Sequence, residues 1–346
     1  MRPIVIAADE VPDGTPRASF PVLVQILDDA ELRSVANGGH VASDAGFDIT
    51  FADASSTLDH EVELYDPVAG SLRAWVRIPS LPGDSDTVFR MDYGTPTGVS
   101  QEDAAAVWSG HRGVWHMEED PSGTAPQTRD STSAVNHGTS VGSMPSSALV
   151  GGISGKAVRF DGSDDKIVIG DEAELVITGA ISIEVWIALD VSAGSQSAFA
   201  RVVDKWSGTF GGGYGLFFSN SGQDFGLNTA DGSNQENVIG NPSLSQDVWY
   251  YVASTWTPGA GTGRLLVDGN VDTSVSTSHS SIKADNQPFT LGRSDDGGID
   301  ACPFRGRIDE VRVSAVSRPP EWFATVNATI RNPSTFCAVG AELPVP

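Results

Sequence analysis

The chain has 346 residues, of which 45 are acidic and 21 are lysine or arginine, so its formal net charge at pH 7 is −24. This balance argues against a nucleic-acid partner, because binding to phosphates depends on clusters of basic side chains. No apolar stretch is long enough to span a bilayer, so direct membrane insertion is not expected. The length suits two domains, each with its own hydrophobic core.

Residues 1–99 alternate short apolar runs with turn residues. Gly, Pro, Asp or Ser bounds each run, and this spacing is typical of a β-sandwich. The expected strands are 3–8, 20–27, 47–51, 61–65, 72–78 and 87–93.

Helices are scarce in the pattern. It predicts a short helix over 100–108, with Ser100 as its cap, and another over 319–327. The first of them marks the junction between a domain over 1–110 and a domain over 111–346. Residues 120–152 then form a connection rich in Ser, Thr, Gly and Pro, and a connection of that length is usually functional or lies over the surface.

The second half continues with β-branched and aromatic runs. The expected strands are 181–189, 248–256 and 304–313, with two strands over 156–169 joined by a turn at Asp161–Gly162 and a hairpin over 264–271 that turns at Asp268–Gly269. We therefore predict an all-β protein made of two β-sandwich domains.

The last of these strands carries an acid where an apolar residue is expected. Strict alternation places Asp309 on the same face as Val311 and Val313, which are expected to face the core. Such an acid has to be hydrogen-bonded, ion-paired or bound to a metal, because an unpaired buried carboxylate is costly. Upstream, a turn at Asp161–Gly162 is followed by further acids, and oxygen ligands of this kind suit calcium. Asp309 is therefore a candidate metal ligand.

The second half resembles the laminin-G/concanavalin-A-like lectin family over roughly residues 112–343. The matching segments are Gly113–Glu118, Phe160–Gly162, Ile183–Trp186, Trp249–Ala253, Leu266–Gly269 and Phe304–Val313. The resemblance implies a two-sheet jelly roll, with a structural calcium ion that ties the first strand, the acidic turn and the last strand together. Carried over by motif, the calcium ligands are Asp309, Asp161, Gly162 and Glu118. The alternative is that these acids cap turns by accepting hydrogen bonds from backbone N–H groups.

The first half resembles a bacterial domain family of unknown function, DUF2341. Its markers are Phe20–Val24, Phe47–Phe51, Ala74–Pro79 and Met91–Gly94. Members of that family typically lie directly before a laminin-G-like module in secreted or surface proteins. The resemblance therefore implies an extracellular or cell-surface location and neighbouring domains of a larger chain, with the secretion signal outside these residues. The aromatic residue that normally opens the family is absent here.

Glycan binding by such a domain needs an aromatic platform for the apolar sugar faces and polar groups that set orientation. The candidate ligand-binding residues are Trp206, Tyr214, Trp256, Glu184 and Trp186. The last two share the non-core face of their strand and can line the concave sheet. The alternative is that each aromatic residue belongs to the core, because aromatic residues are more often part of a core than of a binding platform.

A search for catalytic motifs predicts no catalytic residue. The paired carboxylates of retaining glycosidases, the nucleophile elbow and the zinc-protease motif have no counterpart. The sequence therefore favours non-catalytic recognition of a polysaccharide or a glycoprotein glycan. Two alternatives stay open: a polysaccharide-active hydrolase or lyase that uses the concave face, and a structural spacer without a ligand.

The chain has two cysteines, Cys302 and Cys337, on either side of the closing part of the second predicted sandwich. We predict that they form one disulfide, as in proteins of oxidising compartments. The alternative is a pair of unrelated buried thiols, since only the separation of their Cα atoms decides whether they can be joined.

Overall fold

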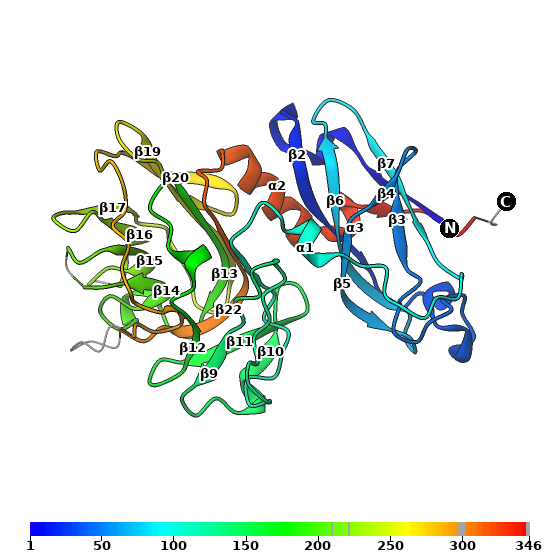
Figure 1. Cartoon of the computed structure of the whole chain (residues 1–346), viewed down its shortest axis with the longest axis horizontal. Helices are drawn as coiled ribbons and strands as arrows, with labels where there is room; N and C mark the ends of the chain where they lie inside the picture. Colours follow the sequence, from blue (N-terminus) through cyan, green and yellow to red (C-terminus); the bar gives the residue numbers. More distant parts are fainter. Residues whose placement is uncertain (209, 221, 296–301, 344–346) are drawn as a thin grey trace. The chain divides into compact units, whose positions relative to one another are not determined.

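The computed structural model describes residues 1–208, 210–220, 222–295 and 302–343 (Figure 1). The fold is all-β, as predicted, and the chain divides into two compact units. The first unit comprises Met1–Ser109 together with Ala324–Pro346, and the second comprises Gly110–Phe323. In the described ranges, no helix combines the length and the apolar character needed to cross a membrane.

Two antiparallel sheets build the first unit, with strand orders β23-β1-β7-β3-β4 and β2-β6-β5. The elements are β1 (Arg2–Ile6), β2 (Arg17–Ile26), β3 (Thr50–Ala52), β4 (Thr57–Leu58), β5 (His60–Asp66), β6 (Ser71–Leu81), β7 (Thr87–Asp92), α1 (Ala104–Val107), α3 (Pro333–Phe336) and β23 (Ala338–Val339). Helix α1 is shorter than the expected helix over 100–108 because its cap is Asp103, whose carboxylate accepts a hydrogen bond from the Ala106 amide at 2.9 Å.

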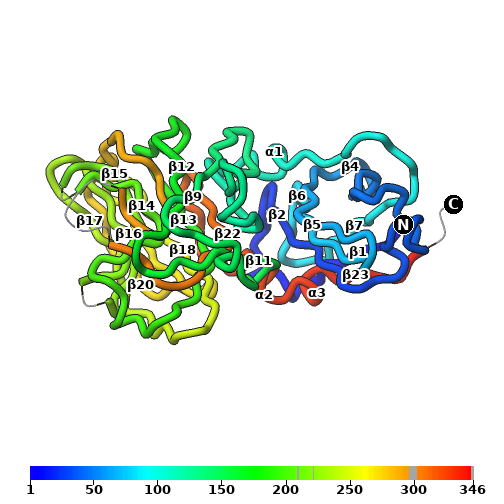
Figure 2. Tube along the Cα trace, turned by 90° about the horizontal axis from the view of Figure 1, so that it is seen from below, coloured from blue at the N-terminus to red at the C-terminus, as the bar shows by residue number. Residues whose placement is uncertain are grey.

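The C-terminal segment belongs to the first unit, which differs from the predicted domain over 111–346. β23 pairs with β1, placing Val339 opposite Ile4, and Figure 2 shows the red C-terminal segment beside β1. Upstream, α2 (Pro320–Arg331) contains the point at which the two units divide. The amide of Leu23 in β2 donates to the hydroxyl of Thr329 in α2 at 3.0 Å. A two-residue strand is too short to be recognised from sequence, so the pairing of β23 with β1 could not be predicted.

The second unit is a two-sheet sandwich. Its eight-stranded sheet has the order β10-β11-β22-β13-β18-β19-β20, with β8 also paired to β22, and its seven-stranded sheet has the order β17-β16-β15-β14-β21-β12-β9. The strands are β8 (Gly113–Trp115), β9 (Thr139–Val141), β10 (Leu149–Gly151), β11 (Lys156–Asp161), β12 (Lys166–Gly170), β13 (Ile181–Leu189), β14 (Arg201–Trp206), β15 (Gly213–Phe218), β16 (Phe225–Ala230), β17 (Gln235–Gly240), β18 (Trp249–Trp256), β19 (Thr262–Val267), β20 (Asn270–Ser276), β21 (Phe289–Leu291) and β22 (Arg305–Ser314).

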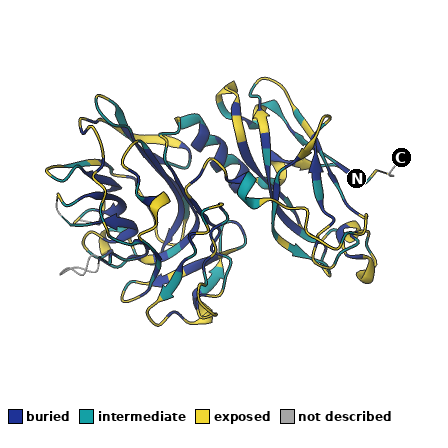
Figure 3. Ribbon diagram, in the orientation of Figure 1, coloured by how far each residue is buried: buried dark blue, intermediate teal, exposed yellow. Residues whose placement is uncertain are grey.

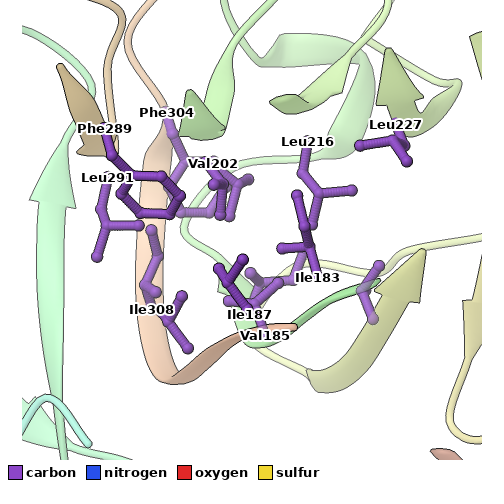
Figure 4. Packing of buried hydrophobic residues seen from close by; sticks show 14 of the residues in the cluster. Ile183, Val185, Ile187, Val202, Leu216, Leu227, Phe289, Leu291, Phe304 and Ile308 are labelled. Atoms are coloured by element: carbon purple, nitrogen blue, oxygen red, sulfur yellow. The ribbon is translucent and has the colours of Figure 1, made fainter. Parts of the chain in front are cut away.

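The core of the second unit lies between these two sheets (Figure 4). Alternate residues of β13, among them Ile183, Val185 and Ile187, point into it, and Leu216 and Phe289 reach it from the opposite sheet. Every residue of β13 is buried, on both faces of the strand, and the strand is dark blue throughout in Figure 3. The apolar alternation in the sequence therefore predicted the inner face correctly.

A β-bulge in β22 decides which way Asp309 points. Across the β13–β22 pair, Glu184 lies opposite Arg312 and Trp186 lies opposite Asp309, so β22 has one more residue than β13 between these two pairs. The extra residue is accommodated near Glu310, whose φ angle is 50°. Directly opposite residues of an antiparallel pair share a face, so Asp309 lies on the outer face with Trp186.

The bulge corrects the predicted orientation of Asp309. Ile308, Val311 and Val313 all face the core, although strict alternation would separate Ile308 from the two valines. Alternation holds only where pairing is unbroken, because one inserted residue moves the following side chains to the other face.

The two cysteines are buried and are not joined to each other, so the predicted disulfide is wrong. Cys302 precedes β22 in the second unit, whereas Cys337 follows α3 in the first unit. Both flank the closing strand in sequence, but the C-terminal segment from Ala324 onward belongs to the first unit, so the two cysteines lie in different units. Burial raises the pKa of the Cys337 thiol, which disfavours its reactive thiolate form.

Candidate functional site

Asp309 stabilises the turn between β10 and β11. Its carboxylate oxygen Oδ2 accepts hydrogen bonds from the amides of Ile153 at 2.8 Å and Ser154 at 3.2 Å. Gly152 lies against the same oxygen, and a Cβ atom at this position would come within 2.4 Å of it. Asp309 thus fits the alternative left open by the sequence, that of an acid that caps a turn.

The predicted calcium ligands do not converge on one point. Asp161 lies opposite Arg305 in the β11–β22 pair, and Asp309 is four residues further along β22, or about 13 Å at the usual strand rise. Glu118 accepts a hydrogen bond from the Lys156 amide at 2.7 Å, at the other end of β11. One ion therefore cannot bind all of these groups, because calcium–oxygen distances are about 2.3–2.6 Å.

Three acids do converge, at the turn between β11 and β12. We call Asp161, Asp164 and Asp165 the acidic turn; one carboxylate oxygen from each lies within 4.8 Å of the others. Gly162 has a φ angle of 80°, which the tight turn requires. Burial raises the pKa of the Asp165 carboxyl, and the charges of the other two acids raise it further, against a hydrogen bond from the Asp161 amide.

Two of the predicted sugar-binding aromatic residues belong to the core. Tyr214 and Trp256 are both members of the buried apolar cluster. The Tyr214 hydroxyl donates to the Leu175 carbonyl at 2.7 Å, and the Trp256 indole donates to the Glu236 carboxylate at 2.8 Å. Neither ring can serve as an exposed platform, because each fills space between the two sheets.

Glu184 and Trp186 lie on the outer face of the eight-stranded sheet, as their alternation predicted, but both are buried. The Tyr251 hydroxyl donates to Glu184 at 2.5 Å, and the Tyr251 ring packs 5.4 Å from that of Trp186. The charge of Glu184 raises the pKa of Tyr251, after the larger effect of burial. These residues form a packed polar cluster rather than an open sugar platform.

Trp206 lies on the outer face of the seven-stranded sheet. In the β14–β15 pair, Trp206, Asp204 and Arg201 stand opposite Gly213, Gly215 and Phe217, so all six positions share this face. The next pairs extend the face to Asn228 in β16, opposite Gly215, and to Asn237 in β17, opposite Asn228.

Four polar residues form a row on this outer face: Arg201, Asp204, Asn228 and Asn237, which we call the Arg201 row. The Arg201 guanidinium donates to the Asn228 side-chain oxygen at 3.1 Å and lies 3.3 Å from the Asp204 carboxylate. A Cβ atom at Gly215 would come within 3.3 Å of both Arg201 and Asn228, so the glycine provides the space that these side chains occupy.

Aromatic rings flank the charged member of the Arg201 row. The guanidinium carbon of Arg201 lies 4.8 Å from the ring centre of Phe217 and 5.9 Å from that of Trp206. A cation over an aromatic face is attracted electrostatically, which fixes the guanidinium in place. Arg201, Asp204, Asn228 and Trp206 are all buried, and Asp204 also accepts a hydrogen bond from the Ser294 hydroxyl at 2.8 Å. Asn237 at the end of the row is exposed.

The sequence patterns missed Arg201 and Asp204 as site residues, although they indicated Trp206. Both polar residues stand in a strand in which a bulge separates Arg201 from Val203, which breaks simple alternation. Asn228 and Asn237 stand in β16 and β17, and the pairing that brings them together is a tertiary feature.

Comparisons with protein families give two matches. A family described as the concanavalin A-like lectin/glucanases superfamily matches residues 161–322. A domain of unknown function, DUF2341, matches residues 45–125. Both segments expected from the sequence are therefore confirmed, in the expected order.

A comparison with solved structures finds similarity at low sequence identity. The binding domain of botulinum neurotoxin serotype D/C VPI 5993 has a TM-score of 0.50 and 10% identity, covering 65% of this chain and 53% of that one. The binding domain of Paraclostridial Mosquitocidal Protein 1 has a TM-score of 0.48 and 11% identity, covering 63% and 52%. The chain thus spans about half the length of these structures. A comparison with curated proteins finds no match.

Proposed function

We propose that this chain, which carries a DUF2341 segment followed by a concanavalin A-like domain, recognises a glycan through the outer face of its seven-stranded sheet. The observation that carries the proposal is the Arg201 row, a set of polar groups held between two aromatic rings on a face that core packing does not use. The description of the matching family names lectins and glucanases, and both kinds of protein act on carbohydrates.

The chemistry of the row suits a hydroxylated ligand. Sugar hydroxyls both donate and accept hydrogen bonds, and the row offers a guanidinium, a carboxylate and two amides. Arg201, Asp204 and Asn228 already hold one another in position, so ordering these three on binding costs little entropy. A ligand approaches from the Asn237 end, where the side chain is exposed.

The cellular setting is part of the proposal. We infer that the protein acts outside the cell or at its surface, as a module of a larger chain that binds a polysaccharide or a glycoprotein glycan. The order of the two matched segments supports this reading, through the secreted or surface setting that the resemblance of the first half to DUF2341 implies.

A structural calcium ion is also proposed, now at the acidic turn alone. The converging oxygens of Asp161, Asp164 and Asp165 support it, because oxygen ligands are those that calcium prefers. A bound cation would offset the mutual repulsion that helps to raise the pKa of Asp165.

The binding experiment uses a bulky substitution, Asn237→Trp, to block the exposed end of the Arg201 row. The purified chain is screened on a glycan array, and each hit is titrated by calorimetry against wild type, Asn237→Trp and the control Asn270→Trp, an exposed asparagine of β20 on the other sheet. We expect Asn237→Trp to weaken binding at least tenfold and Asn270→Trp to leave it unchanged. Equal effects of the two variants would contradict the proposed face. Release of new sugar ends from a bound polysaccharide would instead favour the hydrolase alternative.

A further inference from the structure

A polar groove of about 440 Å³ crosses the outer face of the eight-stranded sheet, where β10, β11, β22 and the end of β13 meet. Arg159 on β11 and Arg307 on β22 are directly opposite each other, so both side chains leave the sheet on the same face. Their paired neighbours Val158 and Ile308 point into the core instead. The groove is therefore lined by side chains that the core does not use.

Asp190, directly after β13, anchors both arginines. The Arg307 Nε donates to one Asp190 oxygen at 3.0 Å, and the Arg159 Nε donates to the other. The Asp190 side chain is only 8% exposed, whereas that of Arg159 is 54% exposed. Within the described part of the chain, no group accepts a hydrogen bond from the terminal nitrogens of Arg159. The anchor thus holds the guanidinium while leaving its terminal donors available.

A second acid in the groove is held less firmly. Asp247 pairs with a terminal nitrogen of Arg307, and its side chain is 64% exposed. An exposed ion pair contributes little to stability, so an incoming oxyanion can take the place of this carboxylate. The groove therefore contains one fixed acid that orients the arginines and one exchangeable acid that a ligand group can replace.

The composition of the groove indicates the class of ligand. Among the described residues that line it, none is aromatic, so an uncharged sugar has no ring to stack on. We propose that this groove binds the carboxylate or sulfate groups of an acidic polysaccharide, with Arg159 as the main donor and Arg307 as the second. Planar arginine donors match both oxyanions in bidentate geometry.

This inference rests on the proposed function and adds a ligand class to it, at a second face of the same unit. The whole chain has a net charge of −24 and repels acidic polymers. A preference for an acidic polymer over its neutral counterpart must therefore arise from locally placed arginine donors, which makes that preference a sharp readout.

The experiment uses the full chain and two matched pairs of probes: oligogalacturonate with its methyl ester, and sulfated dextran with plain dextran. The two pairs distinguish a carboxylate from a sulfate. Affinities are measured for wild type, Arg159→Gln, Asp247→Asn and Arg129→Gln; the control Arg129 has a side chain that is 78% exposed and lies near Glu119. We expect wild type to prefer an acidic probe at least tenfold over its neutral partner. Arg159→Gln should remove this preference, Asp247→Asn should strengthen it, and Arg129→Gln should leave it unchanged.

Adding Asn237→Trp to the set separates the two proposals. Loss of acid preference in Arg159→Gln, with binding unaffected by Asn237→Trp, supports the groove and overturns the face proposed for general glycan binding. Glycan binding that depends on Asn237 but shows no acid preference overturns the groove alone. Equal losses in Arg159→Gln and Arg129→Gln also overturn it, because they would reflect overall charge. Failure to bind any glycan overturns both.

Discussion

Asp309 and Asp165 are both buried acids of the second unit, but different groups surround them. Asp309 accepts hydrogen bonds from two backbone amides of the β10–β11 turn. Asp165 accepts one from the Asp161 amide and also faces the carboxylates of Asp161 and Asp164. Hydrogen bonds to a carboxylate stabilise its charged form, whereas nearby like charges oppose it. A cation would therefore benefit Asp165 more than Asp309.

This contrast gives a prediction for calcium. Added calcium should raise the melting temperature of wild type, by an amount equivalent to about 2.7 kcal/mol when calcium is a hundredfold above its dissociation constant. Asp165→Asn should abolish the response, because it removes a ligand charge from the acidic turn. Asp309→Asn should keep it, although the variant itself is less stable. Calorimetry with calcium or a chelator tests this, and a response lost in Asp309→Asn but retained in Asp165→Asn would reverse the assignment.

At the scale of elements, Glu236 links strands of the two sheets in the second unit. It stands in β17 of the seven-stranded sheet and accepts the indole N–H of Trp256, which belongs to β18 of the eight-stranded sheet. It also accepts the backbone amides of Ser278 at 2.6 Å and His279 at 3.0 Å. Burial alone would raise the pKa of Glu236, but these hydrogen bonds outweigh it and lower the pKa below its usual value of 4.5.

The lowered pKa sets the sign of a pH effect. The carboxylate contributes stability above its unfolded pKa of about 4.5, and this contribution is lost as pH falls through the lower folded value. Glu236→Gln should therefore destabilise the second unit at pH 7, by about 1–3 kcal/mol, because the amide is a weaker acceptor and meets several donors with its own N–H groups. Urea unfolding at pH 7 and pH 3 tests this, with the gap between wild type and variant expected to narrow at pH 3. An equal difference in unfolding free energy between wild type and variant at both pH values would contradict this prediction.

At the scale of the whole molecule, the first unit is completed by residues from the end of the chain. The C-terminal part of α2, α3 and β23 all belong to it. Val326, Ile330 and Phe336 in this segment are buried, and the Arg17 side chain donates to the Thr325 hydroxyl at 3.1 Å. Burying three such apolar side chains contributes about 5–9 kcal/mol, which is comparable to the whole stability of a typical domain.

Removing residues 324–346 should therefore unfold the first unit and leave the second folded. The fragment 110–323 should melt cooperatively on its own, since it contains both sheets of its sandwich. Calorimetry of the full chain, the truncated chain and the fragment tests this. The expectation fails if the truncated chain retains both transitions, or if the fragment shows none.

Local patterns were enough to predict the class of the fold and many of its strands, although they gave no strand over 190–247, where β14, β15, β16 and β17 lie. The run Ile181–Leu189 was expected as a strand and forms β13 with the same bounds, because its alternating apolar residues suit only a strand that faces a core. The resemblances to the two families were likewise inferred from short motifs, and both families match the chain. Two of the predicted site residues, Glu184 and Trp186, were assigned to the correct face, although the sequence could not show that this face is covered.

The sequence by itself determined the all-β class and the strands with clear apolar runs, since side-chain alternation and turn residues act over a few neighbouring positions. Only the tertiary structure decided what depends on pairing between distant strands. The bulge near Glu310 turned Asp309 to the outer face, and the return of β23 to β1 assigned Cys302 and Cys337 to different units. Register likewise brought Arg159 beside Arg307, because the residues that meet across a sheet are set by the pairing of whole strands and leave no local signal in either segment.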